Sequence, residues 1–101
     1  MLAYNKKTNS IFIIELKREN SIETMLRAIL EISTYYCQIN RNQLIKEYAN
    51  PSSQEAKIKK VVLVFKDSLQ HEQYKSVLIK KLAEKLKVDV CLIDNDQIIK
   101  I

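Results

Sequence analysis

The chain has 101 residues, a formal net charge of +5 and no glycine. A chain of this length is expected to form one domain. The absence of glycine excludes the glycine-rich phosphate loops of the Walker and Rossmann nucleotide-binding classes, and the basic balance permits a nucleic-acid partner.

Neither a membrane nor an oxidising compartment is indicated. No apolar run approaches the ~20 residues of a membrane span, and residues 1–7 lack the charged-then-apolar order of a signal peptide. Cys37 and Cys91 stand in apolar patterns without a Cys-x-x-Cys spacing, so we expect buried thiols in a reduced cytoplasm. His71, the single histidine, is interpreted as a surface residue of a first helical turn, and a His/Cys metal site is not expected.

The chain opens with a predicted β-hairpin. Residues 2–5 form a short strand, residues 6–10 a polar turn, and residues 11–17 an apolar strand. A strand that starts at the second residue suggests that the chain begins partway through a sheet, as a fragment of a longer protein would. The unpaired edge of such a sheet predicts association into a homodimer.

Residues 21–39 read as an amphipathic helix. Asn20 and Glu23 resemble a capping box at its start, and Glu23 and Arg27 are spaced for an i,i+4 ion pair on its polar face. The apolar face is expected to contain Ile22, Met25, Leu26, Ile29, Ser33, Tyr36 and Cys37.

The second half of the chain alternates between strands and a helix. Residues 43–49 either continue the helix or form a second short one, and residues 50–53 break it. Residues 61–65 are typical of a central parallel strand covered on both faces. A helix over 69–87 is expected to begin after Ser68 and to bury Tyr74, Leu78, Ile79, Leu82, Ala83 and Leu86. Strands at 88–93 and 98–101 follow, on either side of a turn at 94–96.

The predicted order is therefore ββαβαββ, an α/β fold with a mixed sheet flanked by helices in one domain over residues 1–101. A strand, a helix and a second buried strand form a right-handed βαβ crossover, and the hairpin adds an antiparallel part.

An acid and a base end the strand at 11–17. Residues i and i+2 of a strand point to the same face, so Glu15 and Lys17 are expected side by side with Leu16 packed behind them. This Glu-x-Lys, placed after a hairpin and before an amphipathic helix and a parallel strand, resembles the PD-(D/E)xK nuclease superfamily, whose fold is called restriction-endonuclease-like. The resemblance implies a magnesium-dependent endo- or exodeoxyribonuclease.

The same resemblance assigns roles to three residues. Glu15 and the backbone carbonyl of Leu16 would bind Mg²⁺ or Mn²⁺, and Lys17 would hold or polarise the attacking water. A hard divalent cation takes oxygen ligands and offsets the charge that develops during phosphodiester cleavage.

The chain departs from this family pattern at its start. The family carries a second acid, usually Asp, on the preceding strand, but residues 1–10 contain no acid and Met1 stands in the corresponding place. The family's first strand and helix are also absent. Two hypotheses stay open: a nuclease-like domain, truncated or inactive, and a non-catalytic module of the same fold that binds nucleic acid or protein. A third reading is a small α/β protein whose Glu-x-Lys is a solvated strand end.

Basic side chains supply the expected DNA contacts. We predict phosphate contacts from Arg18, Lys75, Lys80 and Lys81. The alternative is that lysines on the last helix form its solvated face. Among the tyrosines, Tyr36 and Tyr74 stand on apolar stripes and are expected in the core.

Overall fold

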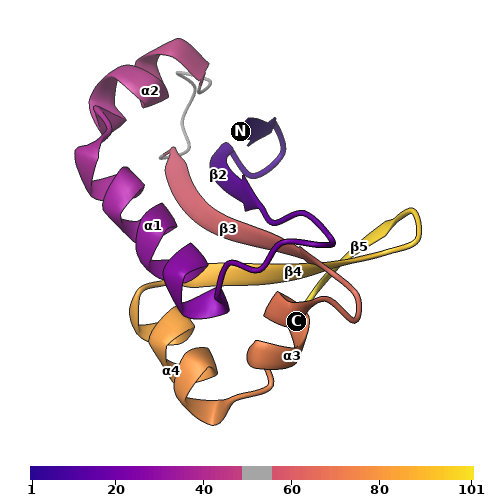
Figure 1. Cartoon of the computed structure of the whole chain (residues 1–101). Helices are drawn as coiled ribbons and strands as arrows, with labels where there is room; N and C mark the ends of the chain where they lie inside the picture. Colours follow the sequence, from indigo (N-terminus) through magenta and orange to yellow (C-terminus); the bar gives the residue numbers. More distant parts are fainter. Residues whose placement is uncertain (49–55) are drawn as a thin grey trace.

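The computed structural model describes residues 1–48 and 56–101, so the predicted break at 50–53 lies outside the described residues. A five-stranded mixed sheet carries helices on one side (Figure 1). The elements are β1 (Leu2–Asn5), β2 (Ser10–Leu16), α1 (Met25–Gln38), α2 (Arg41–Tyr48), β3 (Lys57–Phe65), α3 (Leu69–Gln73), α4 (Val77–Lys85), β4 (Val88–Asp94) and β5 (Gln97–Lys100).

The strands lie side by side in chain order. β2, β3 and β4 are parallel, whereas β1 and β5 pair antiparallel at the two edges. Both crossovers join neighbouring parallel strands, and because such connections are right-handed their helices lie on the same face. The α/β class and the mixed sheet are confirmed. Val61, Val62, Leu63 and Val64 are all buried, as expected of a central strand covered on both faces. Among the described residues, the helices α1, α3 and α4 lie on one side of the sheet (Figure 1).

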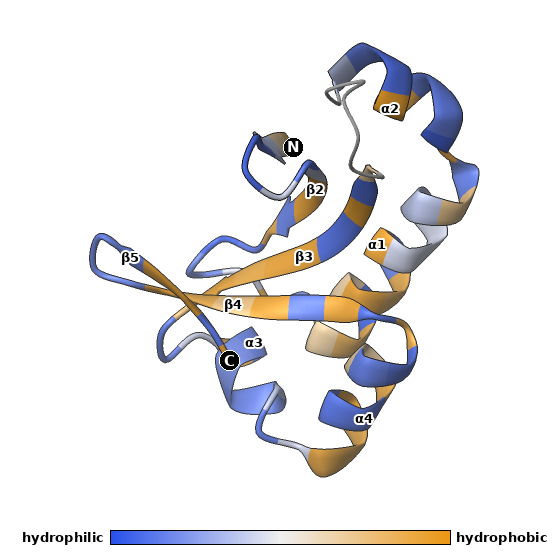
Figure 2. Cartoon of the chain, turned by 180° about the vertical axis from the view of Figure 1, so that it is seen from behind, coloured by the Kyte–Doolittle hydropathy of each residue, from blue (hydrophilic) through white to orange (hydrophobic). Residues whose placement is uncertain are grey.

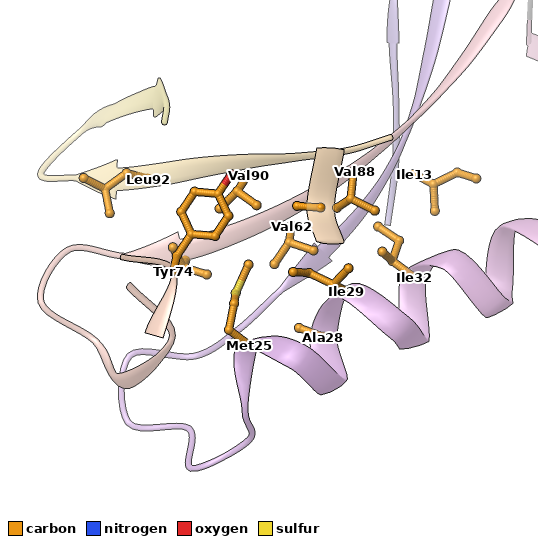
Figure 3. Close-up of a cluster of buried hydrophobic side chains, with 12 residues drawn as sticks. Ile13, Met25, Ala28, Ile29, Ile32, Val62, Tyr74, Val88, Val90 and Leu92 are labelled. Atoms are coloured by element: carbon orange, nitrogen blue, oxygen red, sulfur yellow. The ribbon is translucent and has the colours of Figure 1, made fainter. Parts of the chain in front are cut away.

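The core lies between that face and the helices (Figure 3). Alternate residues of the strands point into it, among them Ile13, Val62, Val64, Val88, Val90 and Leu92. The helices contribute Met25, Ala28, Ile29, Ile32, Tyr74 and Ala83. Tyr74 is buried and Tyr36 is partly buried against the cluster, as expected. Seen from the other side, β3 beyond its lysine-rich start and much of β4 are apolar (Figure 2).

The start of α1 differs from the sequence prediction. Thr24 is the N-cap, with its hydroxyl accepting a hydrogen bond from the backbone N–H of Arg27, so residues 21–24 are not helical and the Asn20 capping box does not form. The helix is consequently rotated relative to the predicted stripe. Ile22 is 90% exposed and Leu26 44% exposed, and Cys37, predicted buried, is exposed while Cys91 is half-buried.

The predicted helix over 69–87 is two helices. Ser68 caps α3 as expected by accepting a hydrogen bond from the N–H of His71. α3 ends after Gln73, Tyr74 turns into the core, and Ser76 precedes α4. Leu78 is 77% exposed instead of buried. Residues 41–48 form the second short helix that the sequence left open.

β3 is longer than predicted and starts at Lys57. It pairs with β2 from Ser10 opposite Lys57, but its pairing with β4 begins only where Lys60 meets Val88. The first three residues of β3 therefore extend past the beginning of β4.

Candidate functional site

Lys17 lies at the carboxyl end of β2, on the face that the helices cover. Its backbone N–H donates to the carbonyl of Leu63, and its side chain is only 6% exposed. The ammonium donates to Glu15 Oε1 at 3.0 Å, which confirms that the two residues lie side by side. Leu16 points to the opposite face and is 39% exposed, so the expectation that it packs behind them is wrong.

Two further carboxylates come from outside the strand. Glu23 Oε2, in the connection before α1, accepts a hydrogen bond from Lys17 Nζ at 2.7 Å, and Glu31 Oε2, on α1, lies 3.7 Å from it. Arg27 Nε lies 2.8 Å from Glu31 and 3.6 Å from Glu23. We call these residues, Glu15, Lys17, Glu23, Arg27 and Glu31, the Lys17 cluster. The predicted Glu23–Arg27 pair is thus present.

Contacts within the cluster favour the charged forms of Lys17 and Glu31. Burial by itself lowers the pKa of Lys17, but hydrogen bonds and charges of Glu23 and Glu15 outweigh it and raise that pKa above its ordinary value of 10.5. The hydrogen bond from Arg27 is the main reason that the pKa of Glu31 lies below its ordinary value of 4.5.

Helix α3 fixes the connection that carries Glu23. The side chain of Gln70 is fully buried, and its Nε2 donates to the carbonyls of Ser21 and Glu23. Gln73 Oε1 accepts from the backbone N–H of Met25 at 2.7 Å. The end of β2, the start of α1 and α3 therefore meet at this site, although the contacts of Gln70 span 47 and 49 residues of sequence.

The sequence analysis missed Glu23 and Glu31 as site residues. Glu23 was assigned to a capping box and to the solvent face of a helix, whereas it turns inward ahead of the helix. The local pattern carried no signal for this position, because the crossover geometry and the contacts of Gln70 set it.

The oxygen atoms of the cluster are candidate ligands for a divalent cation. In the described part of the chain, no group of three or more His, Cys, Asp or Glu side chains is arranged to hold a metal ion. Mg²⁺, however, is commonly bound through one or two carboxylates, with water and substrate phosphate completing the shell. Glu15 bonds Lys17 through Oε1. Glu23 Oε1 is buried without a hydrogen-bond partner and lies 3.6 Å from Arg27 Nε. These two carboxylates, which share one ammonium, are a suitable donor pair.

The predicted phosphate-binding residues lie elsewhere. Arg18 is exposed directly after the strand. Lys75 is bonded to Glu72 at 2.9 Å, Lys80 lies 5.9 Å from the ring centre of Tyr74, and Lys81 is exposed on α4. None of the contacts described here joins these four residues to the Lys17 cluster.

Comparisons of the chain with protein-family models, with curated proteins and with solved structures found no match. No helix in the described residues is long and apolar enough to cross a membrane. The functional interpretation therefore depends on the geometry of the chain itself.

Proposed function

We propose that this domain hydrolyses phosphodiester bonds in nucleic acid, with DNA as the expected substrate, using a divalent metal ion held beside Lys17. The observation that carries the proposal is the convergence of Glu15 and Glu23 on one ammonium at the carboxyl end of a parallel strand. Such a set of hard oxygen donors beside a fixed cation suits a site for an anionic phosphate.

The residues of the cluster would have different roles in metal binding and in orienting the attacking water. Glu15 and Glu23 would hold Mg²⁺ or Mn²⁺, with the backbone carbonyl of Leu16 as the expected third protein ligand. The bound ion supplies charge neutralisation and lowers the pKa of an attacking water. The ammonium of Lys17 has three N–H donors. Two of them are committed to Glu15 and Glu23, and Glu31 Oε2 lies 3.7 Å from the same nitrogen. The third donor would orient a water or a phosphate oxygen in competition with Glu31.

Two features support the nuclease-like reading of the fold. The hairpin of β1 and β2 leads through α1 into the parallel strand β3, which is the order that the resemblance to the restriction-endonuclease-like fold implies. The acid that the family carries on the preceding strand is missing here. Glu23, in the connection before α1, would supply the second carboxylate instead.

A second candidate function is a non-catalytic module of the same fold that binds nucleic acid. It is favoured by the burial of Lys17, whose side chain is 6% exposed and lies within 4 Å of three carboxylates. In this reading the cluster is a structural ion-pair network and binding depends on other basic residues.

Cleavage assays distinguish the two functions. Supercoiled plasmid and end-labelled single-stranded DNA are incubated with Mg²⁺ or Mn²⁺ and the unaltered chain, Glu15→Gln or Glu23→Gln. We expect metal-dependent cutting that falls by about a hundredfold or more in both variants. Glu19→Gln, an exposed neighbour with the same chemical change, is the control and should cut normally. Absence of cutting by the unaltered chain, or equal cutting by all variants, contradicts the proposal.

We also propose that two copies associate through the edge of β1, in a reduced compartment such as the cytoplasm that suits the free thiols Cys37 and Cys91. Met1 and Ile14 exchange backbone hydrogen bonds. Because pairs alternate along an antiparallel ladder, the backbone N–H and C=O of Leu2 point away from β2. Sedimentation should detect a dimer that Leu2→Lys weakens. A monomer at every concentration rejects this association.

A further inference from the structure

A second polar site lies at the opposite end of the parallel strands. There the first residues of β3 extend past the start of β4, and the space beside them is a cleft of about 830 Å³. Its charged lining residues are Lys57, Lys59, Glu84, Lys87, Asp89 and Lys100. We call it the β3 cleft. Since the parallel register places Glu15 opposite Val62, the cleft and the Lys17 cluster are at different ends of the sheet.

Some basic groups at this end already have partners. Lys60 donates a hydrogen bond to the carbonyl of Leu86 at the C-terminus of α4, and it lies 4.8 Å from the ring centre of Tyr36. Lys100 forms an ion pair with Asp89 at 3.3 Å. These contacts neutralise a helix terminus and a carboxylate, which leaves neither cation fully available to a ligand.

Three lysines of the cleft have no carboxylate partner among the described residues. They are Lys57, Lys59 and Lys87, and the contact shown for Lys59 is with the ring of Phe12 at 6.0 Å. Glu84 also lines the cleft and has no ion-pair partner among the described residues. The cleft therefore carries an excess of uncompensated positive charge.

The spacing of these lysines suits a repeating anion. Lys57 and Lys59 are two positions apart on one strand, so they lie on the same face about 6.6 Å apart. Beside them, the N–H of Lys57 donates to the carbonyl of Asn9, and the alternation along the ladder turns the N–H of Ile58 to the side that β4 does not reach. A backbone N–H in this position can also bind a phosphate oxygen. A peptide adding to the sheet would find an edge of only three residues, and lysines on such an edge disfavour strand addition.

We propose that the β3 cleft binds the sugar-phosphate backbone of a nucleic-acid strand through Lys57, Lys59 and Lys87. The inference rests on the proposed function for the identity of the ligand. The cleft would bind the substrate at a distance from the site of cleavage. This differs from the expectation from the sequence, which placed the phosphate contacts on Arg18, Lys75, Lys80 and Lys81.

The test is a binding titration without cleavage. Fluorescence anisotropy of a labelled single-stranded or duplex DNA is measured in EDTA at several salt concentrations, on the Glu15→Gln background. The cleft variant is Lys57→Gln/Lys59→Gln/Lys87→Asn. Asparagine is used at position 87 because Lys87 has a positive φ of 55°, which asparagine tolerates. The matched control with the same loss of charge is Lys75→Gln/Lys80→Gln/Lys81→Gln.

The cleft variant should bind at least tenfold more weakly, and its plot of log affinity against log salt should be flatter by about 2, since each single-strand phosphate contact contributes about 0.7 to that slope. The control should bind within about threefold of the unaltered chain. A cleft variant that binds normally, or a control that loses as much, overturns the inference. The two proposals can fail separately. If the cleft variant binds DNA normally and the unaltered chain still cuts DNA in a way that depends on Glu15, the inference about the cleft is wrong and the proposed function stands.

Discussion

At the residue scale, Lys17 determines whether the Lys17 cluster is stable. Its ammonium is the buried member of a group with three partly exposed carboxylates. Removing one partner of a buried charged hydrogen bond leaves the others without compensation. The lysine therefore has a structural role whether or not the site is catalytic.

Lys17→Met, which keeps most of the side-chain volume, should lower the free energy of unfolding by about 2 kcal/mol. The measurement is urea denaturation followed by circular dichroism. Lys81→Met, an exposed lysine without an ion pair in the described structure, should change the midpoint little. Equal midpoints for the two variants would show that the contacts of Lys17 with Glu15 and Glu23 contribute no net stability.

The same groups predict how stability depends on pH. The pKa of Glu31 is lowered from 4.5, mainly by Arg27, so its stabilisation is present above that ordinary value and is lost as the pH falls through the folded pKa. The pKa of Lys17 is raised from 10.5, so its stabilisation is present below 10.5 and is lost as the pH rises through the folded pKa. Urea midpoints measured from pH 3 to 11 should fall at both ends, and Glu31→Gln should reduce the acid loss. An acid loss as steep in Glu31→Gln as in the unaltered chain would reject this assignment.

At the element scale, α3 acts as a clamp on the connection between β2 and α1. Gln70 is fully buried, and its amide donates to two carbonyls of that connection, while its Oε1 is buried without a partner. The five-residue helix thus holds Glu23 in place over a sequence separation of 47 residues.

Gln70→Met preserves the volume but leaves the carbonyls of Ser21 and Glu23 without this donor, and it should cost about 2 kcal/mol of stability. Gln38→Met, an exposed change at the end of α1, is the control. Thermal unfolding measures both. In amide hydrogen exchange, residues 18–24 should exchange faster in Gln70→Met at temperatures where the chain stays folded. Unchanged exchange there would mean that α3 does not restrain the connection.

The elements that follow local chemistry were predictable from the sequence. The strand at Leu2–Asn5 has the expected bounds, and Ser68 caps a helix as its type and position indicated. The break between α3 and α4 was not predictable, because no glycine or proline marks it and Tyr74 leaves the helix to fill the core. Because the chain has no glycine, positive φ angles are adopted by Asn9, Asp67, Lys87 and Asn95. The glycine that usually marks such a turn in a sequence is therefore missing.

At the scale of the whole molecule, the helices that contribute to the core lie on one face of the sheet, and the two ends of the sheet differ. Ligands of open α/β sheets bind where the strand order reverses, but β2, β3 and β4 follow one another without reversal and their helices share one face. Residues 1–48 and 56–101 therefore form no such crevice. Their candidate sites are the Lys17 cluster at the carboxyl ends of the strands and the β3 cleft at the amino ends.

The same view explains which part of the candidate site the sequence could predict. The two-residue repeat of side chains along a strand is enough to predict that Glu15 lies beside Lys17. The arrival of Glu23 and Glu31 depends on how the crossover lays α1 across β2, and the β3 cleft depends on unequal strand lengths. Both are properties of tertiary structure that no local pattern encodes.

Titration with Mn²⁺, with the free ion followed by its electron paramagnetic resonance signal, tests most directly whether Glu15 and Glu23 form a metal site. The unaltered chain and Glu19→Gln should bind Mn²⁺ alike, whereas Glu15→Gln and Glu23→Gln should each weaken binding at least tenfold. Binding that is equal in all four proteins, or absent from the unaltered chain, would contradict a metal site at the Lys17 cluster and would leave the cluster as a structural ion-pair network.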